Sequence, residues 1–362
     1  MRRTIGASES SSIYLLGICV GSLLSLFLSL VLRNVSATLD GMSVYSWCGY
    51  AIMQVGFIAT VFVYARVRKI NVVRIAKLRG RLNPMQIALL PLIAIATILV
   101  FLPLANAWSA FLGVIGYHGA GVSMPSFSNA GIYFLALFVM AIMPAIGEEI
   151  FMRGTVFPGL ATRNVWFGVL MSGLFFSLMH ANPVQTVHQF GLGVVLALVV
   201  ALSGSIWASV IIHFFNNFIS ITLTAYLPQV DAIYVKLGYF NWLTGAASVV
   251  IGIVLLVCLL YLFYRAGDKR QKAGEVSNVY QEDGFTIVAT ANVTTKSENV
   301  FKGMIRFFKS LFTKQGRKSI QYELEERNEV EYIGKNQKLS GVWIALALVC
   351  AYWLYAFISG LI

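Results

Sequence analysis

The run GIYFLALFVMAIMPAIGEEIFMRGTVFPGL, residues 131–160, decides the fold class because it places three charged side chains inside an otherwise apolar segment. It is long enough to cross a bilayer as a helix, which takes about 20 residues. The rest of the chain has the same character: 58% of its 362 residues are hydrophobic and 12% are charged. A soluble domain carries about a quarter charged residues. We therefore predict an integral membrane protein and exclude a cytosolic globular enzyme.

Eight or nine membrane-spanning helices fit the apolar runs of the sequence. The first run is about 20 residues long and lacks a small-residue cleavage site, so we interpret it as a helix and not as a signal peptide. The predicted fold class is all-α, a polytopic transmembrane helical bundle of about eight or nine spans with a small cytoplasmic insert. The predicted spans are residues 13–32, 45–65, 85–104, 131–160, 164–181, 187–203, 205–225, 246–264 and 341–361.

The positions of Lys and Arg orient these spans, because basic residues in short loops stay on the cytoplasmic side of a membrane. With the amino terminus in the cytoplasm, nine spans place 25 of the 27 basic residues at or near that side and leave only Arg33 and Lys236 outside. The carboxyl terminus then lies outside. The formal net charge of +12 therefore reflects orientation in a membrane and contact with its lipids, and we do not expect nucleic acid as a partner.

A long polar segment interrupts the apolar runs near the carboxyl terminus. Arg265 to Lys338 holds 14 basic and 10 acidic residues. We divide the chain accordingly into N-terminal transmembrane helices (1–130), a helical core that carries the intramembrane charges (131–225), a further transmembrane helix (226–265), the cytoplasmic polar insert (266–340) and a C-terminal transmembrane helix (341–362).

Within the insert, Thr286–Val293 alternates enough to suggest a short strand, and residues 300–312 have helical periodicity. This helix could lie on an anionic leaflet or pack on the protein itself, and the sequence favours neither arrangement. Its apolar residues are Val300, Phe301, Met304, Ile305, Phe308, Leu311 and Phe312, beside the basic residues Lys302, Arg306, Lys309 and Lys314.

Glu148 and Glu149 are the carboxylates that lie inside the predicted spans. An ionised side chain in a bilayer costs about 2.5–3.5 kcal/mol on insertion scales, so an adjacent pair needs partners or a function. On a helix, Arg153 falls one turn beyond Glu149 and on its face, while Glu148 points about 100° away. The pattern predicts a Glu149–Arg153 salt bridge and a free Glu148 that acts as a base. The alternative is a purely structural role for both acids.

Two further polar motifs lie in neighbouring apolar runs. Phe176-x-x-x-His180 ends the fifth predicted span, and His213-x-x-x-Asn217 lies in the seventh. A lone histidine in an apolar helix is more often a packing residue than a catalyst. His213 and Asn217, however, share one helix face, as two groups that act on one substrate atom must. We treat the remaining polar candidates as background: His118, His188 and Asn216.

The depth of these residues in the bilayer can be estimated from the helical rise. At about 1.5 Å per residue, His213 lies about 12 Å and Glu148 about 18 Å from the cytoplasmic ends of their spans. His180 lies about 24 Å from the start of its span. We expect a tilt, or a later start of that helix, to bring His180 level with the other two.

The three motifs together resemble a known family. EExxxR at 148–153, FxxxH at 176–180 and HxxxN at 213–217 resemble, in order and approximate spacing, the motifs of the CPBP family. This family contains the CAAX proteases and bacteriocin-processing enzymes, also called the Abi family. The resemblance covers residues 130–222, about a quarter of the chain. It implies an intramembrane endopeptidase with a helical fold, and we expect a bacterial cell membrane as its location.

The resemblance also implies roles for individual residues. By motif position, Glu148 and His180 activate the water that attacks the peptide bond. His213 and Asn217 correspond to a polar pair that binds a metal or stabilises the oxyanion. The candidate catalytic residues are Glu148, Glu149, Arg153, His180, His213 and Asn217.

The residues leave the question of a metal open. His180, His213 and Glu148 are side chains of the kind that bind zinc, and zinc would lower the pKa of its bound water to about 7. The sequence has no HExxH spacing, and asparagine is an uncommon zinc ligand. A metal-free mechanism that uses the glutamate is the alternative.

The expected substrate is a membrane-associated peptide or protein. It could be a prenylated CAAX protein, or a bacterial peptide in maturation, bacteriocin immunity or signalling. An ion-coupled transporter is a competing function, because intramembrane Glu and His can relay protons. Transporters often have internal repeats, and no second EExxxR-like segment occurs in the sequence. A catalytically silent membrane scaffold or immunity protein is a further alternative, against which the intact motifs argue.

Overall fold

The computed structural model describes residues 5–119, 123–226, 242–274, 280–282, 285–287, 300–327 and 337–362. Its helices are α1 (Ala7–Val31), α2 (Val44–Val67), α3 (Val72–Ile75), α4 (Pro84–Val114), α5 (Ala130–Ala136), η1 (Leu137–Ile142), α6 (Met143–Phe151), η2 (Met152–Val156), α7 (Phe157–Ala161), α8 (Val165–Leu178), η3 (Pro183–Gln185), α9 (Thr186–Ser203), α10 (Ile206–Tyr226), α12 (Trp242–Gly274), α13 (Val300–Phe312), α14 (Lys314–Arg327) and α15 (Ser340–Ser359). Its strands form two antiparallel hairpins, β1 (Thr38–Leu39) with β2 (Met42–Ser43) and β3 (Tyr280–Glu282) with β4 (Phe285–Ile287).

The helices confirm the predicted all-α membrane bundle. Within the described ranges, eight helical segments are long and apolar enough to cross a membrane. They include the continuous segment from α5 to α7, Ala130–Ala161, in which the acidic pair lies. The fifth predicted span, 164–181, is instead the shorter helix α8, whose 14 residues fall below the length of a full span.

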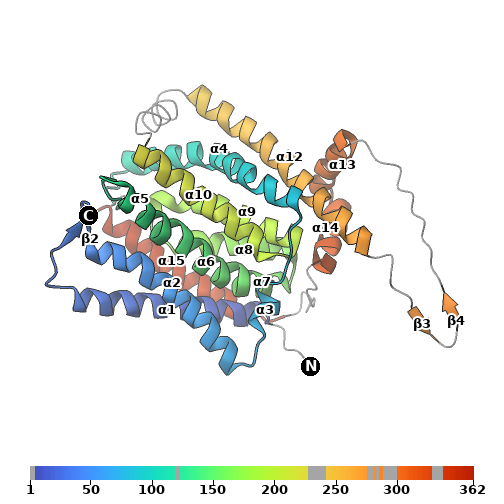
Figure 1. Ribbon diagram of the computed structural model, residues 1–362, viewed down its shortest axis with the longest axis horizontal. Helices are drawn as coiled ribbons and strands as arrows, with labels where there is room; N and C mark the ends of the chain where they lie inside the picture. The colour runs from blue at the N-terminus through green and yellow to red at the C-terminus, as the bar shows by residue number, and fades with distance from the viewer. Residues whose placement is uncertain are drawn as a thin grey trace.

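Successive spans run in alternating directions through one bundle (Figure 1). The start of α1 lies beside the start of α15, where the Ala7 N–H donates to Gln337 Oε1 at 3.1 Å. At the opposite end, the His118 N–H donates to the Gly360 carbonyl at 2.7 Å. The helices α13 and α14 lie at the end where α1 starts (Figure 1). Within the described residues, eight segments therefore run between the two ends, and α8, which the sequence predicts as a full span, is a ninth and shorter helix.

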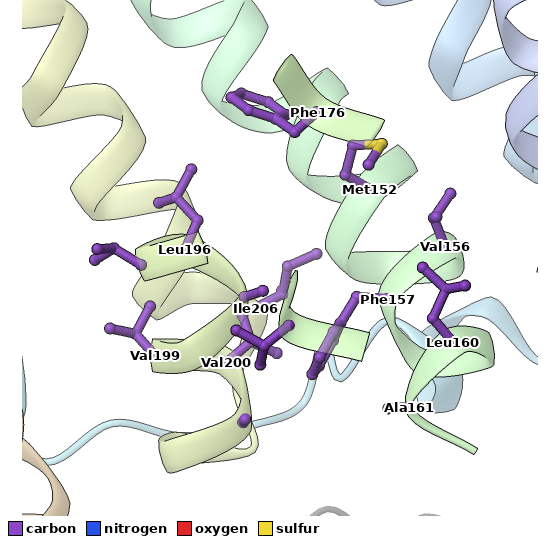
Figure 2. Packing of buried hydrophobic residues seen from close by; sticks show 14 of the residues in the cluster. Met152, Val156, Phe157, Leu160, Ala161, Phe176, Leu196, Val199, Val200 and Ile206 are labelled. Carbon is purple, nitrogen blue, oxygen red and sulfur yellow. The ribbon is translucent and has the colours of Figure 1, made fainter. Parts of the chain in front are cut away.

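The centre of the bundle is formed by α8, α9 and the segment from α6 to α7. Within the most apolar window of each span, 56% of the residues of Pro183–Ser203 are buried, compared with 17% for α15. The inner helices pack through branched and aromatic side chains (Figure 2). The outer helices expose large apolar residues, which in a bilayer contact lipid. The residues that Figure 2 labels are Met152, Val156, Phe157, Leu160, Ala161, Phe176, Leu196, Val199, Val200 and Ile206.

Two π-helical turns flank the acidic pair, and each precedes a proline. The turn η1 ends two residues before Pro144, and η2 ends two residues before Pro158. Proline has no N–H, and its ring collides with the carbonyl four residues earlier in a regular α-helix. A wider turn relieves that collision, and such π-bulges are frequent at functional sites. The prolines therefore account for the local distortion around Glu148 and Glu149.

Helix α8 ends inside the bundle because of the residues that follow it. Ala181 has φ of +46°, which is left-handed backbone that a helix cannot continue. Pro183 disfavours helical backbone at the preceding residue, and Asn182 instead caps η3 by accepting from the Val184 N–H. His180 therefore lies in the turn just past the end of a short helix. A later start of the helix does not explain the depth of His180 in the membrane, since α8 begins at Val165, next to the predicted start.

The described part of the insert has the predicted helix. Helix α13 packs on the protein through Met304, which contacts Cys258 of α12 at 3.3 Å, and through Phe307. The ring centroid of Phe307 lies 5.5 Å from that of Tyr264. The structure thus shows packing on the protein itself. The predicted strand overlaps β4 at residues 286–287, and the rest of it, 288–293, lies outside the described residues.

The close contact between α8 and α9 predicts that a larger residue at a glycine in the contact lowers the stability of the protein. A Cβ added to Gly193 would lie 2.9 Å from the Cα of Gly173, which is backbone and cannot rotate away. We expect Gly193→Ala to lower the free energy of unfolding by about 1–3 kcal/mol, as overpacking does. Gly49→Ala is the control, because nothing lies within 4 Å of the added Cβ. Thermal unfolding in detergent measures both variants, and equal midpoints would contradict the prediction.

Candidate active site

The acidic pair lies on α6, and the two carboxylates have different exposure. The side chain of Glu149 is fully buried, at 0%, as is that of Arg153 on η2. The side chain of Glu148 is 11% exposed and that of His180 is 21% exposed. Water can therefore reach Glu148 and His180 more readily than it can reach the Glu149–Arg153 pair.

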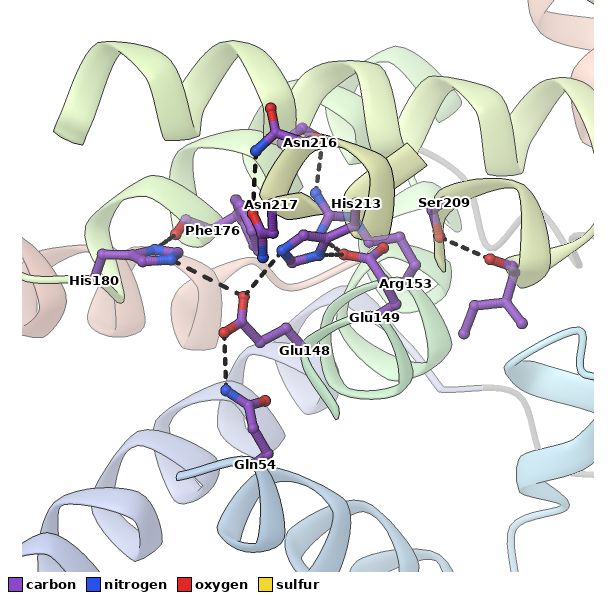
Figure 3. Close-up of polar contacts among 12 residues, drawn as sticks. Gln54, Glu148, Glu149, Arg153, Phe176, His180, Ser209, His213, Asn216 and Asn217 are labelled. Carbon is purple, nitrogen blue, oxygen red and sulfur yellow. Dashed lines mark hydrogen bonds and ion pairs between the residues drawn. The ribbon is translucent and has the colours of Figure 1, made fainter. Parts of the chain in front are cut away.

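Glu149 joins two positively polarised groups through one oxygen. Its Oε1 accepts from Arg153 Nη1 at 2.8 Å and lies 3.0 Å from His213 Nδ1 (Figure 3). The salt bridge that helical spacing predicts between Glu149 and Arg153 is present. Its additional bond to His213, from α10, was not predicted. Glu149 thus connects the motif on α6 and η2 to the motif on α10.

The other contacts of Arg153 are with residues of α8 and α9. Its Nη2 donates to the carbonyl of Gly193 at 2.8 Å, and its Cζ lies 4.4 Å from the ring centroid of Phe176. A guanidinium over an aromatic face is held by cation–π attraction, which strengthens when water is excluded. Phe176 also meets the rings of His180 and His213 edge-on, at centroid distances of 5.0 and 5.7 Å. The phenylalanine of the FxxxH motif therefore contacts the arginine and both histidines.

Glu148 uses its two oxygens differently. Oε1 accepts from Gln54 Nε2 at 3.0 Å, across the contact between α2 and α6. Oε2 has no hydrogen-bond partner among the described residues. It lies 4.0 Å from His180 Nε2 and 3.9 Å from His213 Nε2, too far for direct hydrogen bonds (Figure 3). One carboxylate oxygen thus faces two imidazole nitrogens across a short gap.

The partners of the two rings indicate which nitrogen carries the proton. His180 Nδ1 lies 2.7 Å from the Phe176 carbonyl, and His213 Nδ1 lies 3.0 Å from the Glu149 carboxylate. Both oxygens can only accept, so each Nδ1 donates its hydrogen. In the neutral form of either ring, Nε2 is then a free acceptor that faces Glu148. A water in this gap would have three acceptors around it and two hydrogens to donate.

Asn217 lies near this group but is bonded elsewhere. Its Nδ2 donates to the Met140 carbonyl at 3.2 Å, and its Oδ1 accepts from Asn216 at 3.1 Å. Met140 is four residues before Pro144, so its carbonyl lacks the helical N–H that would otherwise bind it. The Asn217 amide replaces that missing donor and holds η1 against α10.

The structure brings five of the six predicted residues into one connected cluster and places Asn217 beside it. The largest omission from the sequence analysis is Gln54, which carries a recognisable signal: an amide side chain in the middle of the apolar run 45–65. Of the residues treated as background, Asn216 lies next to the cluster, where its Nδ2 donates to Asn217 Oδ1 at 3.1 Å.

The donors around the gap resemble a zinc ligand set in type, two imidazole nitrogens and one carboxylate oxygen. Their spacing is wider than such a site requires. Of the side chains that the structure describes, no three from His, Cys, Asp and Glu are arranged so that they could hold a metal ion. The arrangement as it stands fits a water molecule better than a zinc ion.

These features define a class of protein: an integral multi-pass membrane protein with a buried glutamate and histidine site inside its helical bundle. Residues 130–219 match the family model described as type II CAAX prenyl endopeptidase Rce1-like. The match covers about a quarter of the chain and supports its resemblance to the CPBP and CAAX protease family, a family of membrane peptidases. Comparisons with curated proteins and with solved structures returned no match.

The two glutamates should respond differently to the same substitution. Glu149→Gln leaves Arg153 buried without its counter-ion, and losing one partner of a buried pair costs about 3–5 kcal/mol. Glu148→Gln removes an acid that has no ion pair with arginine and should leave the fold nearly intact. Thermal unfolding in detergent should therefore show a lower midpoint for Glu149→Gln only. If Glu148→Gln is the variant that unfolds, the two assignments must be exchanged.

Proposed function

We propose that this protein is an intramembrane endopeptidase of the CAAX protease type, which hydrolyses a peptide bond in a membrane-associated peptide or lipidated protein. The observation that carries the proposal is the gap between Glu148 and the two histidines. An unpartnered carboxylate oxygen faces His180 Nε2 and His213 Nε2 at 4.0 and 3.9 Å. Peptide hydrolysis needs a base that is positioned to take a proton from water, and this gap is of the size that one water can bridge.

In the proposed reaction, Glu148 is the general base. Its Oε2 takes a proton from the water as the water oxygen bonds to the peptide carbonyl carbon. When the carbon–nitrogen bond breaks, Glu148 returns that proton to the leaving amine. His180 holds the water from the other side of the gap, as its Nε2 faces the same oxygen. The products are a carboxylic acid, which keeps the second proton of the water, and an amine, so atoms and protons balance; the acid then passes that proton to the amine, giving a carboxylate and an ammonium group.

The charge of the cluster supports a role for His213 in stabilising the tetrahedral intermediate. Two carboxylates and the Arg153 guanidinium leave one net negative charge, which a single added proton balances. Such a proton is shared among the coupled groups that titrate together. When it is on His213, Nε2–H becomes a donor aimed at the gap, while Nδ1–H stays on Glu149. A donor of this kind stabilises the negative oxygen that develops on the carbonyl.

The remaining residues of the cluster act as supports. Glu149 fixes the ring of His213 and balances its positive charge, as a carboxylate does behind a catalytic histidine. Arg153 neutralises Glu149 and ties it to α9 through the Gly193 carbonyl. We assign Asn217 to positioning, because its amide nitrogen is bonded to the Met140 carbonyl.

We further propose that the end of the bundle where α1 begins faces the cytoplasm. The basic loop that contains α3 and the basic helices α13 and α14 belong to this end (Figure 1). Basic residues near membrane spans are retained on the cytoplasmic side. A bacterial cell membrane is the proposed location, on the strength of the family resemblance.

Removing the base or its partner should abolish cleavage. We expect Glu148→Ala and His180→Ala each to lower kcat by at least about 100-fold, the lower range for general acid–base catalysis. The readout is proteomic comparison of cells that carry each variant, in which the uncut precursor of the native substrate accumulates. His118→Ala is the matched control, since this exposed histidine lies outside the cluster. Normal processing by Glu148→Ala would overturn the proposed function.

Metal dependence is a separate question with its own measurement. Because the donors are too widely spaced to form a three-ligand metal site, we derive no step through zinc and expect activity to survive a chelator. Metal analysis of the purified, active protein should find far less than one equivalent of zinc. If a chelator abolished the activity and only zinc restored it, Glu148, His180 and His213 would have to move closer together to bind a metal.

A further inference from the structure

Gln54 is a polar residue inside a membrane-spanning helix, where burying a polar side chain destabilises the protein unless it is hydrogen-bonded. It lies on α2, in the segment outside the family match, and is 4% exposed. A buried amide that makes no hydrogen bonds destabilises the folded protein. Its Nε2 bonds Glu148, but its Oε1 has no partner among the described residues. The residue is therefore only half satisfied, and its satisfied half is the one that touches the proposed base.

A glycine on the facing helix brings the amide into range. A Cβ added to Gly147 would lie 2.6 Å from Gln54 Oε1, 3.0 Å from its Cβ and 3.3 Å from its Cα. Any larger residue at position 147 would therefore press on the backbone of α2. Glycine next to the acidic pair lets α2 approach α6 closely enough for a hydrogen bond of 3.0 Å from Gln54 to Glu148.

The bond determines how the Glu148 carboxylate is presented. Carboxylate oxygens are equivalent until one of them is engaged. With Oε1 held by Gln54, Oε2 is the oxygen that faces His180 and His213. The contact thus supplies the orientation that a general base needs.

We propose that Gln54 is a positioning residue that holds the Glu148 carboxylate with Oε2 directed at the two histidines. The proposal rests on the proposed function, and it adds to the site a residue from the N-terminal helices. A structural role is the competing explanation for a buried glutamine. That role predicts a loss of stability on removal of the amide. A positioning role predicts that stability is kept, because the unpaired Oε1 is removed as well.

Gln54→Met tests this directly, since methionine has nearly the same length and no amide. We expect kcat to fall about tenfold with little change in KM, because the reacting oxygen is no longer held in place. The thermal midpoint in detergent should change little. Gln54→Glu, which replaces the N–H donor with a second carboxylate, should lower kcat as well. Thr60→Val is the control, a buried polar residue of the same helix whose hydroxyl bonds only the Gly56 carbonyl.

A second variant tests the same contact from the facing helix. Gly147→Ala should act like Gln54→Met if it remains folded, because it separates the two helices.

The outcomes separate this proposal from the proposed function. An unchanged kcat in Gln54→Met overturns the role of Gln54, while Glu148→Ala still abolishes cleavage. A fall in activity that follows a fall in the thermal midpoint also overturns it, in favour of a structural role. If Glu148→Ala retains cleavage, the proposed function fails, whatever Gln54→Met does to kcat.

Discussion

The buried ion pair between Glu149 and Arg153 is the interaction on which the rest of the site depends. Both side chains are fully buried, where an unpaired charge is far more costly than it is in water. The protein compensates the guanidinium with a carboxylate, a backbone carbonyl of α9 and an aromatic face of α8. Each of these partners comes from a different helical segment. Satisfying one charge therefore fixes the relative positions of the helices that carry the site.

The two π-turns show how the backbone accommodates this arrangement. Pro144 and Pro158 each leave a carbonyl without its usual helical donor, and the turns before them are widened. At the first turn, the free Met140 carbonyl is bonded by Asn217 from α10. The carbonyl that the proline leaves unpaired in η1 thus accepts a hydrogen bond from α10. The polar residues of the HxxxN motif have two different tasks, since His213 faces the carboxylates and Asn217 fastens the distorted helix.

The site also crosses the boundary of the segment that matches the family model. Residues 130–219 supply both glutamates, the arginine, the histidines and Asn217. The hydrogen bond to Glu148 Oε1 is donated by Gln54 of α2, which lies outside that segment. The N-terminal helices consequently contact the proposed base in addition to surrounding the core. Gly147 makes this possible, because it removes the side chain that would otherwise separate α2 from α6.

Much of this protein is determined by its sequence alone. Apolar runs locate the spans to within several residues, because a segment of that composition and length has no other stable place than a bilayer. The spacing of Glu149 and Arg153 predicts their ion pair, since helical geometry is local. The three motifs predict which polar residues meet. The spans and the ion pair can be predicted because they need only periodicity and composition, whereas the meeting of the three motifs is implied by their resemblance to a known family.

Other features were decided by the tertiary structure. The end of α8 depends on a left-handed Ala181 and on how the following turn packs, so the full span predicted over 164–181 became a shorter helix. The bond from His213 to Glu149 and the bond from Gln54 to Glu148 join residues 64 and 94 positions apart. No periodicity links such positions along the chain. Only the packing of α10 and α2 against α6 determines which oxygen each partner reaches, and therefore which carboxylate oxygen is left to face the histidines.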